Sequence, residues 1–544
     1  MLTRVAGGRV IDPANGRDEV GDVWIRDGRI VDAPHGARPD TTYDAAGKIV
    51  MAGAIDIHSH IAGWNVNAAR LLLPELHHAA IRRAPPISLA SAQWSTFETG
   101  CLYAAMGFTT VVEPAVSPHH ALHAHLELAD IPIIDKAILT VLGNDDFMLN
   151  LLRSKESAAA IEGYVAWTLG MSRGLGIKVV NAGGAAAFKD NVRTFSFDDV
   201  VPSYGVSSRA IVKALQRAVN ALGVPHPLHV HCNNLGLAGS AETALTTIAA
   251  AEDLPLHLAH LQFYGYGKEG ERGFSSAAAS LAEAVNATHN VTIDVGQVMF
   301  GQTVTISSDV LRQFNARHQA HPRKWLILDG DANGGGIVPY NYRRSDFYNA
   351  IQWAVGLELF LLIDTPWRVF FTTDHPNGAH FTTYPEIFAL LMSRDLRAKW
   401  MAELPPAAIS LTTLPSIARE YSLVEIATMT RAAPAKLLGL TDRGHLKAGA
   451  VADVAVYDND DDRAKMFRAA ALVFKDGELV VRDGSVIHCR WGRALTVKPE
   501  RDQAIDRRMR AYYEDRYGLA VEFLKVPEEA LGRPEPFELV SCVS

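Results

Sequence analysis

The chain has 544 residues, of which 48% are hydrophobic, enough to bury a large core in more than one domain. Its formal net charge is -8 and it carries no basic block, so we expect no nucleic-acid partner. No apolar run reaches the roughly 18 residues of a membrane span, and no signal-peptide segment opens the chain. The four cysteines form no CxxC pair, which is typical of reduced cytosolic thiols, and we therefore expect a cytoplasmic protein.

Short alternating segments near both ends predict a small β-sandwich. Residues 1–50 alternate apolar and polar positions between glycine and aspartate turns, which is typical of short antiparallel strands. The same pattern returns within residues 441–490, for example in Ala452–Tyr457. We therefore expect the two segments to join into one sandwich that is built from both ends of the chain.

Residues 51–440 contain eight candidate buried strands, and most of them are separated by helix-like stretches such as Ser207–Leu222 and Ala241–Glu252. Strand–helix alternation of this length predicts an α/β fold with a parallel sheet closed into a (β/α)8 TIM-type barrel. The predicted strands are Ala54–His58, Thr109–Glu113, Ile131–Leu142, Ile177–Asn181, Leu228–Cys232, Leu256–His260, Val291–Gly296 and Val369–Asp374.

Two intervals, 59–108 and 297–368, are long enough to hold insertions over the barrel mouth. The second contains the glycine-rich segment Gly330–Gly336, which we interpret as a flexible turn, because no Walker lysine follows it as in a phosphate loop. Residues 491–544 are mixed and charged, and we expect a C-terminal extension at the surface or against a partner.

Polar side chains close several of the predicted strands. The carboxyl ends of parallel barrel strands share one rim, and alternate residues of a strand point to one face, so six polar groups are expected to meet there. Neutral imidazoles and carboxylates are ligands for divalent cations. The candidate metal ligands are His58, His60, Lys178, His231, His260 and Asp374.

A lysine among histidines fits a site for two cations, which need an anionic bridge. An amine that burial keeps neutral can add carbon dioxide, and each oxygen of the resulting carbamate on Lys178 can bind one ion. Two cations lower the pKa of a shared water, which then attacks a carbonyl carbon. Asp374 would pass its proton to the leaving nitrogen. This chemistry is amide hydrolysis, and nitrogen-rich ligation favours zinc over iron, cobalt or manganese.

Each residue also has an alternative role. Lys178 could lie on the surface, and Asp374 could cap a helix that starts near Pro376. His229 should share the face of His231 one layer deeper, and we interpret it as a core residue. Asn233 could bind a substrate amide or stabilise a loop turn.

The histidine pair at His58 and His60, the strand-four lysine and the three later ligands resemble the amidohydrolase superfamily, in its dihydroorotase and hydantoinase layout, over roughly residues 1–490. Three longer stretches, Gly176–Gly184, Leu228–Gly236 and His257–Gln262, are similar to the A-subunit family of formylmethanofuran dehydrogenase and formyltransferase/hydrolase complexes. This resemblance implies a dinuclear zinc site in which carboxylated Lys178 is a ligand and Asp374 is both ligand and acid/base.

The function that we favour is hydrolysis of the N-formyl amide of a methanofuran-type cofactor to formate and free amine. It would take place within a formyltransferase/hydrolase complex of one-carbon metabolism, beside the other subunits of that complex. The alternatives are the same subunit in a formylmethanofuran dehydrogenase, a stand-alone cyclic-amide hydrolase of the dihydroorotase or hydantoinase type, and a non-catalytic scaffold.

Two further features bear on the substrate. In hydantoinase-like relatives the aspartate that ends strand eight is often followed by histidine and then Ala-Pro. Here the segment Thr373–Asn377 reads Thr-Asp-His-Pro-Asn. This departure bears on the substrate assignment and not on the metal site. The acidic tail of a methanofuran-type cofactor could pair with Arg343 and Arg344, although two solvated arginines are the alternative.

Overall fold

The computed structural model describes residues 1–36, 38–63, 66–67, 72, 95–192, 194–307, 336–532 and 536–543. Apart from Gly336, the predicted turn at Gly330–Gly336 lies outside these residues, as do parts of the predicted insertion at 59–108. Within the described part of the chain, each helix is too short or too polar to cross a bilayer. The cytoplasmic location stays a prediction.

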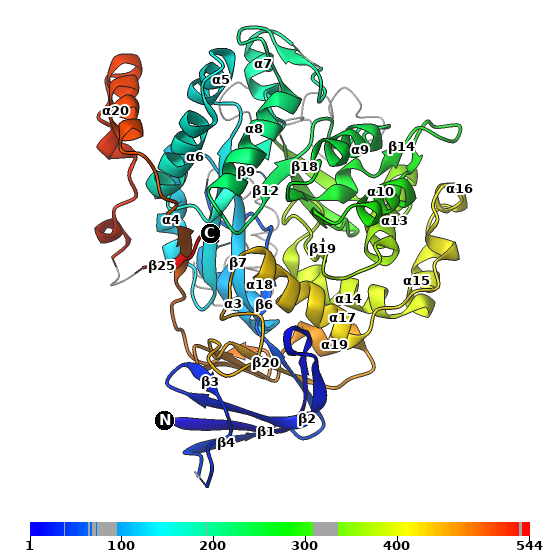
Figure 1. Ribbon diagram of the computed structural model, residues 1–544. Coiled ribbons are helices and arrows are strands. Elements are labelled where there is room, and N and C mark those ends of the chain that lie inside the picture. Colours follow the sequence, from blue (N-terminus) through cyan, green and yellow to red (C-terminus); the bar gives the residue numbers. More distant parts are fainter. Residues whose placement is uncertain are drawn as a thin grey trace.

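A parallel sheet forms the main body of the chain (Figure 1). Among the described residues, eight strands pair in chain order, each with the next. A bridge between Ser59 and His375 joins the first strand to the last, and the N–H of His60 donates to the carbonyl of His375 at 2.8 Å. The sheet is therefore closed, and the predicted (β/α)8 barrel is confirmed. Its strands are β6 (Ala54–Asp56), β7 (Phe108–Val116), β8 (Asp135–Leu142), β9 (Gly176–Val180), β12 (Leu228–His231), β13 (Leu256–Leu258), β16 (Val291–Asp294) and β19 (Val369–Phe370).

Helices follow the strands and cover the outside of the barrel, so the strands are buried on both faces, as parallel strands usually are. In α8 the side chain of Ser207 accepts the N–H of Ala210 at the helix start, and Ile211, Leu215 and Val219 are buried at helical spacing. The helices between strands are α3 (Thr96–Ala105), α4 (Ala121–Ala129), α5 (Asp146–Arg153), α6 (Ala158–Ser172), α7 (Gly184–Lys189), α8 (Ser208–Ala221), α9 (Ala241–Ala250), α10 (Ala278–Ala287) and α13 (Phe347–Leu362). After β19 come α14 (Tyr384–Met392), α15 (Arg394–Met401), α16 (Pro406–Ile409), α17 (Leu423–Ala427) and α18 (Ala433–Leu437).

Both ends of the chain contribute to a second sheet below the barrel (Figure 1). Val50 pairs with Val456, so the N-terminal and C-terminal parts share one ladder. The two ends of the chain therefore join, as predicted. Val10, Val50 and Phe474 belong to a hydrophobic cluster separate from the barrel core, so this sheet folds over a core of its own. Its described strands are β1 (Leu2–Asp12), β2 (Arg17–Arg26), β3 (Arg29–Val31), β4 (Thr41–Asp44), β5 (Lys48–Ala52), β20 (Val454–Asp458), β21 (Leu472–Lys475), β22 (Glu478–Arg482) and β23 (Ser485–Val486).

The C-terminal extension is built partly into the barrel sheet. Strand β24 (Ala494–Val497) runs parallel to the start of β8, with Leu495 opposite Ala137, and β25 (Phe537–Val540) pairs with β24. Between them, α20 (Ala504–Tyr517) lies on the outside of the barrel near α6 (Figure 1). The extension therefore adds two strands to the barrel sheet as well as covering the surface.

An antiparallel pair of strands, β17 (Gly301–Ser307) and β18 (Gly336–Tyr342), follows β16. The hydroxyl of Thr303 hydrogen-bonds to the carbonyl of Pro376, and the N–H of Met299 donates to the carbonyl of Gly378 at 3.1 Å. The second predicted insertion therefore contacts the loop that follows β19 at the barrel mouth.

Candidate metal centre

The six predicted ligands come from five different barrel strands and converge at the carboxyl end of the barrel. His58 and His60 follow β6, Lys178 lies within β9 and His231 ends β12. His260 and Asp374 lie just beyond β13 and β19. Each of the six residues is at most 4% exposed, so six polar groups are buried together, which we call the six-residue cluster.

His58 stands in the middle of this cluster. Its Nε2 atom is 3.2 Å from Nζ of Lys178 and 3.0 Å from Oδ1 of Asp374. The Nε2 atom of His60 is 3.4 Å from the same carboxylate oxygen. Donor atoms of His58, His60 and Asp374 all lie within 4.8 Å of one another, which is compact enough for one cation.

His260 and His231 complete the cluster on its other side. The ring centroid of His260 is 5.2 Å from that of His58 and 4.7 Å from that of His231. Among the described residues, the buried Nδ1 atom of His260 has no hydrogen-bond partner. A buried ring nitrogen rarely stays without a partner, so this atom fits a ligand role.

The amine of Lys178 has a lowered pKa, which suits the predicted formation of a carbamate. Burial lowers the pKa of Lys178 below its ordinary value, and the negative charges of Asp374, Asp294 and Glu113 offset this only in part. The surface alternative for Lys178 is wrong, because the side chain is 2% exposed. A buried amine with a lowered pKa is more often neutral, and the neutral amine is the form that adds carbon dioxide.

Asp374 is anionic and firmly placed. Burial raises the pKa of Asp374. The charges of His260 and His58 and the hydrogen bonds from the histidines lower this pKa by more than burial raises it, so the net pKa lies well below the usual range. The side-chain amide of Asn377 donates to Oδ2 at 2.8 Å. Among the described residues no helix starts at Pro376, since the next helical turn begins at Phe381, so the helix-cap alternative is wrong.

Glu113 supports His60 and was missed in the sequence. Its Oε1 atom is 2.9 Å from Nδ1 of His60, and Oε2 accepts the N–H groups of Ile61 and Ala62. Burial lowers the pKa of His60, but Glu113 and Asp374 more than offset this and raise it to about 9. The available signal was that Glu113 ends the predicted strand Thr109–Glu113.

Asp294 was also missed in the sequence: it ends β16, but it lies inside the predicted strand Val291–Gly296. Its Oδ2 atom is 3.0 Å from both Nδ1 of His58 and Nε2 of His257, and Oδ1 accepts the N–H of His260 at 2.6 Å. Burial raises the pKa of Asp294, but His58 and His257 more than offset it, so the net pKa lies below the ordinary value.

His229 is fully buried beneath His58, in agreement with its interpretation as a core residue. Its Nε2 atom is 3.0 Å from Nδ1 of His58, and its Nδ1 atom is 3.0 Å from Nε2 of His226. Donor atoms of His58, His229 and Asp294 form a second compact group. The core layer below the six-residue cluster is therefore polar.

The predicted substrate-binding residues make their contacts outside the six-residue cluster. Asn233 donates to Oδ1 of Asn181 at 2.7 Å and accepts the hydroxyl of Ser208 at 3.1 Å. The Arg344 guanidinium lies 3.9 Å from the Trp400 ring centroid and pairs with Glu403 at 3.1 Å. Arg343 is exposed. A substrate role for Asn233, Arg343 and Arg344 stays a prediction.

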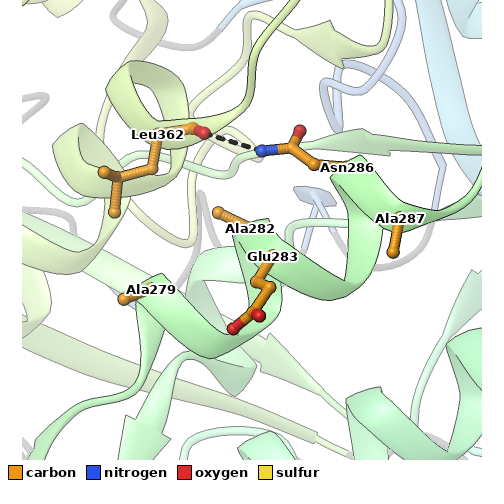
Figure 2. A pocket seen from close by; sticks show the side chains of 6 residues that line it. All are labelled: Ala279, Ala282, Glu283, Asn286, Ala287 and Leu362. Carbon is orange, nitrogen blue, oxygen red and sulfur yellow. Dashed lines mark hydrogen bonds between the residues drawn. The ribbon is translucent and has the colours of Figure 1, made fainter.

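A surface hollow between α10 and α13 is a different feature (Figure 2). The amide of Asn286 donates to the carbonyl of Leu362 at 3.0 Å, where both helices end. These ends lead into the starts of β16 and β19, so the hollow faces away from the six-residue cluster. Its lining offers one carboxylate and is formed by Ala279, Ala282, Glu283, Asn286, Ala287 and Leu362.

Comparisons with known proteins agree with this geometry. A model of the amidohydrolase family matches residues 41–488. The A-subunit of the formyltransferase/hydrolase complex Fhc from Methylorubrum extorquens is 52% identical over 551 residues, and the match covers 100% of both chains. Protein FwdA from Methanocaldococcus jannaschii is 38% identical over 516 residues, covering 91% of this chain and 90% of that protein.

A solved structure shows that this similarity extends to the fold of the whole chain. The crystal structure of the formyltransferase/hydrolase complex (FhcABCD) from Methylorubrum extorquens, in complex with methylofuran, contains a chain that is 52% identical to this one. The two superpose with a TM-score of 0.95, and each is covered over 100% of its length.

Proposed function

The chain belongs to the amidohydrolase family, as its residue pattern indicated, and we propose that it is the hydrolytic subunit of a formyltransferase/hydrolase complex. Its reaction would be hydrolysis of the N-formyl amide of a methylofuran- or methanofuran-type cofactor to formate and free amine. The observation that carries the proposal is the buried six-residue cluster within a chain that matches the Fhc A-subunit from end to end.

The six-residue cluster would hold two divalent metal ions, with the four histidines and Asp374 as ligands and Lys178 as the carbamate that bridges them. The buried imidazoles, the anionic Asp374, the lowered pKa of Lys178 and the Nδ1 atom of His260, which has no hydrogen-bond partner among the described residues, support this assignment. Nitrogen-rich ligation favours zinc. When bound, such ions lower the pKa of a water and polarise the carbonyl of the substrate.

Asp374 would move the proton in this reaction. Asn377 engages Oδ2, so the Oδ1 atom is left facing His58 and His60 at the centre of the six-residue cluster. A carboxylate in this position accepts the proton of the attacking water at Oδ1 and then donates it to the departing amide nitrogen. The amine therefore leaves in its neutral form, and the formic acid that remains becomes formate when it releases the second proton of the water to solvent.

The tail of the cofactor would be recognised away from the six-residue cluster. Arg344 already pairs with Glu403 and stacks on Trp400, so Arg343 is the better candidate to meet an acidic tail. Asn233 is held by Asn181 and Ser208 on the loop after β12, and it would contact the amide end of the substrate.

The direct test is to purify the complex that contains this chain, supply the N-formyl cofactor and measure formate together with metal content. We expect formate release and about two metal ions per chain. Absence of formate from fully metal-loaded complex would contradict the proposal. Turnover of dihydroorotate or hydantoin would favour a stand-alone cyclic-amide hydrolase. Co-purification with a redox-active partner would favour the dehydrogenase complex. A metal content well under one ion per chain would favour a non-catalytic scaffold.

A further inference from the structure

Asp294 lies directly beneath the six-residue cluster without belonging to it. Its side chain is 0% exposed, and one carboxylate receives hydrogen bonds from three groups. Oδ2 is 3.0 Å from Nδ1 of His58 and from Nε2 of His257, while Oδ1 accepts the backbone N–H of His260 at 2.6 Å. Asp294 therefore contacts two members of the cluster at once.

The contact with His58 concerns the ring nitrogen that faces away from Lys178 and Asp374. Nε2 of His58 points at these two residues, so Nε2 is the nitrogen that can bind a metal, and Nδ1 must then carry the ring proton. A carboxylate at 3.0 Å from Nδ1 favours this tautomer and sets the orientation of the ring.

We propose that Asp294 is the positioning residue of the metal centre, holding the His58 ring as its Nδ1–H tautomer and the His260 backbone in place before metal binds. This inference rests on the proposed function, because it takes His58 and His260 to be metal ligands. Asp294 itself touches neither the substrate nor the reacting atoms, so it acts through the two histidines.

The tautomer of His58 also bears on the ring protons of the histidines packed below it, His229, His226 and His257. The Nε2 atom of His229 lies 3.0 Å from Nδ1 of His58 and 3.6 Å from Oδ2 of Asp294. If the Nδ1–H of His58 is shared between Asp294 and His229, then His229 accepts at Nε2, carries its own proton on Nδ1 and donates to Nε2 of His226 at 3.0 Å. On the other side, the Thr292 hydroxyl can donate to Nδ1 of His257 at 2.9 Å, which leaves Nε2–H of His257 to donate to Asp294.

Replacement of Asp294 by asparagine separates this role from simple packing. Asparagine has nearly the same shape but only one side-chain oxygen, and its amide would turn N–H groups toward an N–H donor. The Asp294→Asn variant therefore cannot accept from His58, His257 and the His260 backbone together. Its buried volume stays almost unchanged.

The test uses the full-length chain in its complex, with Zn²⁺ affinity measured by chelator competition and the visible spectrum recorded with Co²⁺. We expect Asp294→Asn to bind Zn²⁺ about 10- to 100-fold more weakly and to alter the Co²⁺ spectrum. The matched control is Glu358→Gln on α13, because Glu358 is also 0% exposed and accepts hydrogen bonds from Thr413, Ser276 and Leu414 outside the cluster. This control should lower thermal stability and leave Zn²⁺ affinity unchanged.

A second variant covers the case in which Asp294→Asn does not fold. His257→Gln removes one donor to Asp294 and should weaken Zn²⁺ binding by a few-fold. If the unaltered chain binds no metal, the proposed metal centre itself is wrong. If the unaltered chain binds metal but the foldable variant keeps its affinity and spectrum, the positioning role is overturned and the proposed function stands.

Discussion

The Nζ atom of Lys178 lies 3.2 Å from Nε2 of His58, although the two residues are 120 positions apart in the chain. Both side chains are buried, and burial lowers the pKa of the amine. A neutral amine at this place can become a carbamate, which would put an anion between cations that otherwise repel each other. The chemistry that we propose depends on this pair.

Replacing Lys178 should remove the anionic bridge. We expect Lys178→Ala to retain less than about one metal ion per chain and to lose at least 100-fold in formate release, because metal-assisted attack needs both ions. Lys178→Arg is the matched control, since it keeps a long nitrogen-bearing side chain but forms no carbamate, and it should fail in the same way. Metal analysis and native mass spectrometry check this, and a fully active Lys178→Arg chain would refute it.

Replacing Asp374 by asparagine should act on the chemical step. The loss of a proton acceptor at Oδ1 is expected to lower kcat by about 10²- to 10⁴-fold and to change KM much less. Asn377→Ala, which removes only the hydrogen bond to Oδ2, should cost several-fold. Steady-state kinetics of formate release with parallel metal analysis distinguishes the two variants, and equal losses in both would count against the proton-transfer role.

The His60–Glu113 pair should make the stability of the metal-free protein depend on pH. The folded pKa of His60 is raised from 6.5 to about 9, so protonated His60 stabilises the folded chain fully below pH 6.5, and this contribution is lost as pH rises through about 9. The shift corresponds to roughly 3 kcal/mol. Denaturant unfolding of chelated protein at several pH values measures it, and Glu113→Gln should flatten the slope.

Arg343 should affect substrate affinity and leave the metal centre unchanged. An exposed arginine that pairs with one carboxylate of an acidic tail contributes modestly, so we expect Arg343→Ala to raise KM about two- to five-fold and to leave kcat unchanged. The double Arg343→Ala and Arg344→Ala variant should raise KM little further, because Arg344 is engaged by Glu403. An unaltered KM in the double variant would remove both residues from the substrate site.

The C-terminal extension should be held to the barrel and sandwich by a buried ion cluster. Asp135 at the start of β8 lies 3.0 Å from both Lys475 and Arg443, and Arg443 also pairs with Glu538 of β25 at 2.7 Å. Lys475→Met breaks a buried pair and should reduce the free energy of unfolding by about 3–5 kcal/mol.

Lys465→Met is the control for this prediction, because Lys465 pairs with Asp460 at the surface. It should leave the unfolding midpoint nearly unchanged. The domain boundaries near residues 440 and 490 remain proposals, and limited proteolysis of the Lys475→Met variant tests whether residues 491–544 detach first. Cleavage that starts elsewhere would contradict this anchoring role.

The amino-acid sequence alone indicated the barrel strands and the six polar groups that lie in them or just after them. Both are local signals, since an apolar run marks a buried strand and the rim of a parallel barrel brings strand ends together whatever lies between them. For this reason Lys178 and Asp374 could be assigned before their surroundings were known. The shared sandwich was predictable because both ends show the same alternating pattern.

Only the tertiary structure decided the partners of these groups. Glu113 ends a predicted strand just as Asp374 does, and Asp294 lies near the end of another, but nothing nearby in the chain tells which imidazole each carboxylate meets. His58 and Asp294 are separated by 236 positions, and β24 joins the barrel from the far end of the chain. Such contacts depend on strand tilt and barrel closure, which are properties of the whole packed sheet and of no single segment.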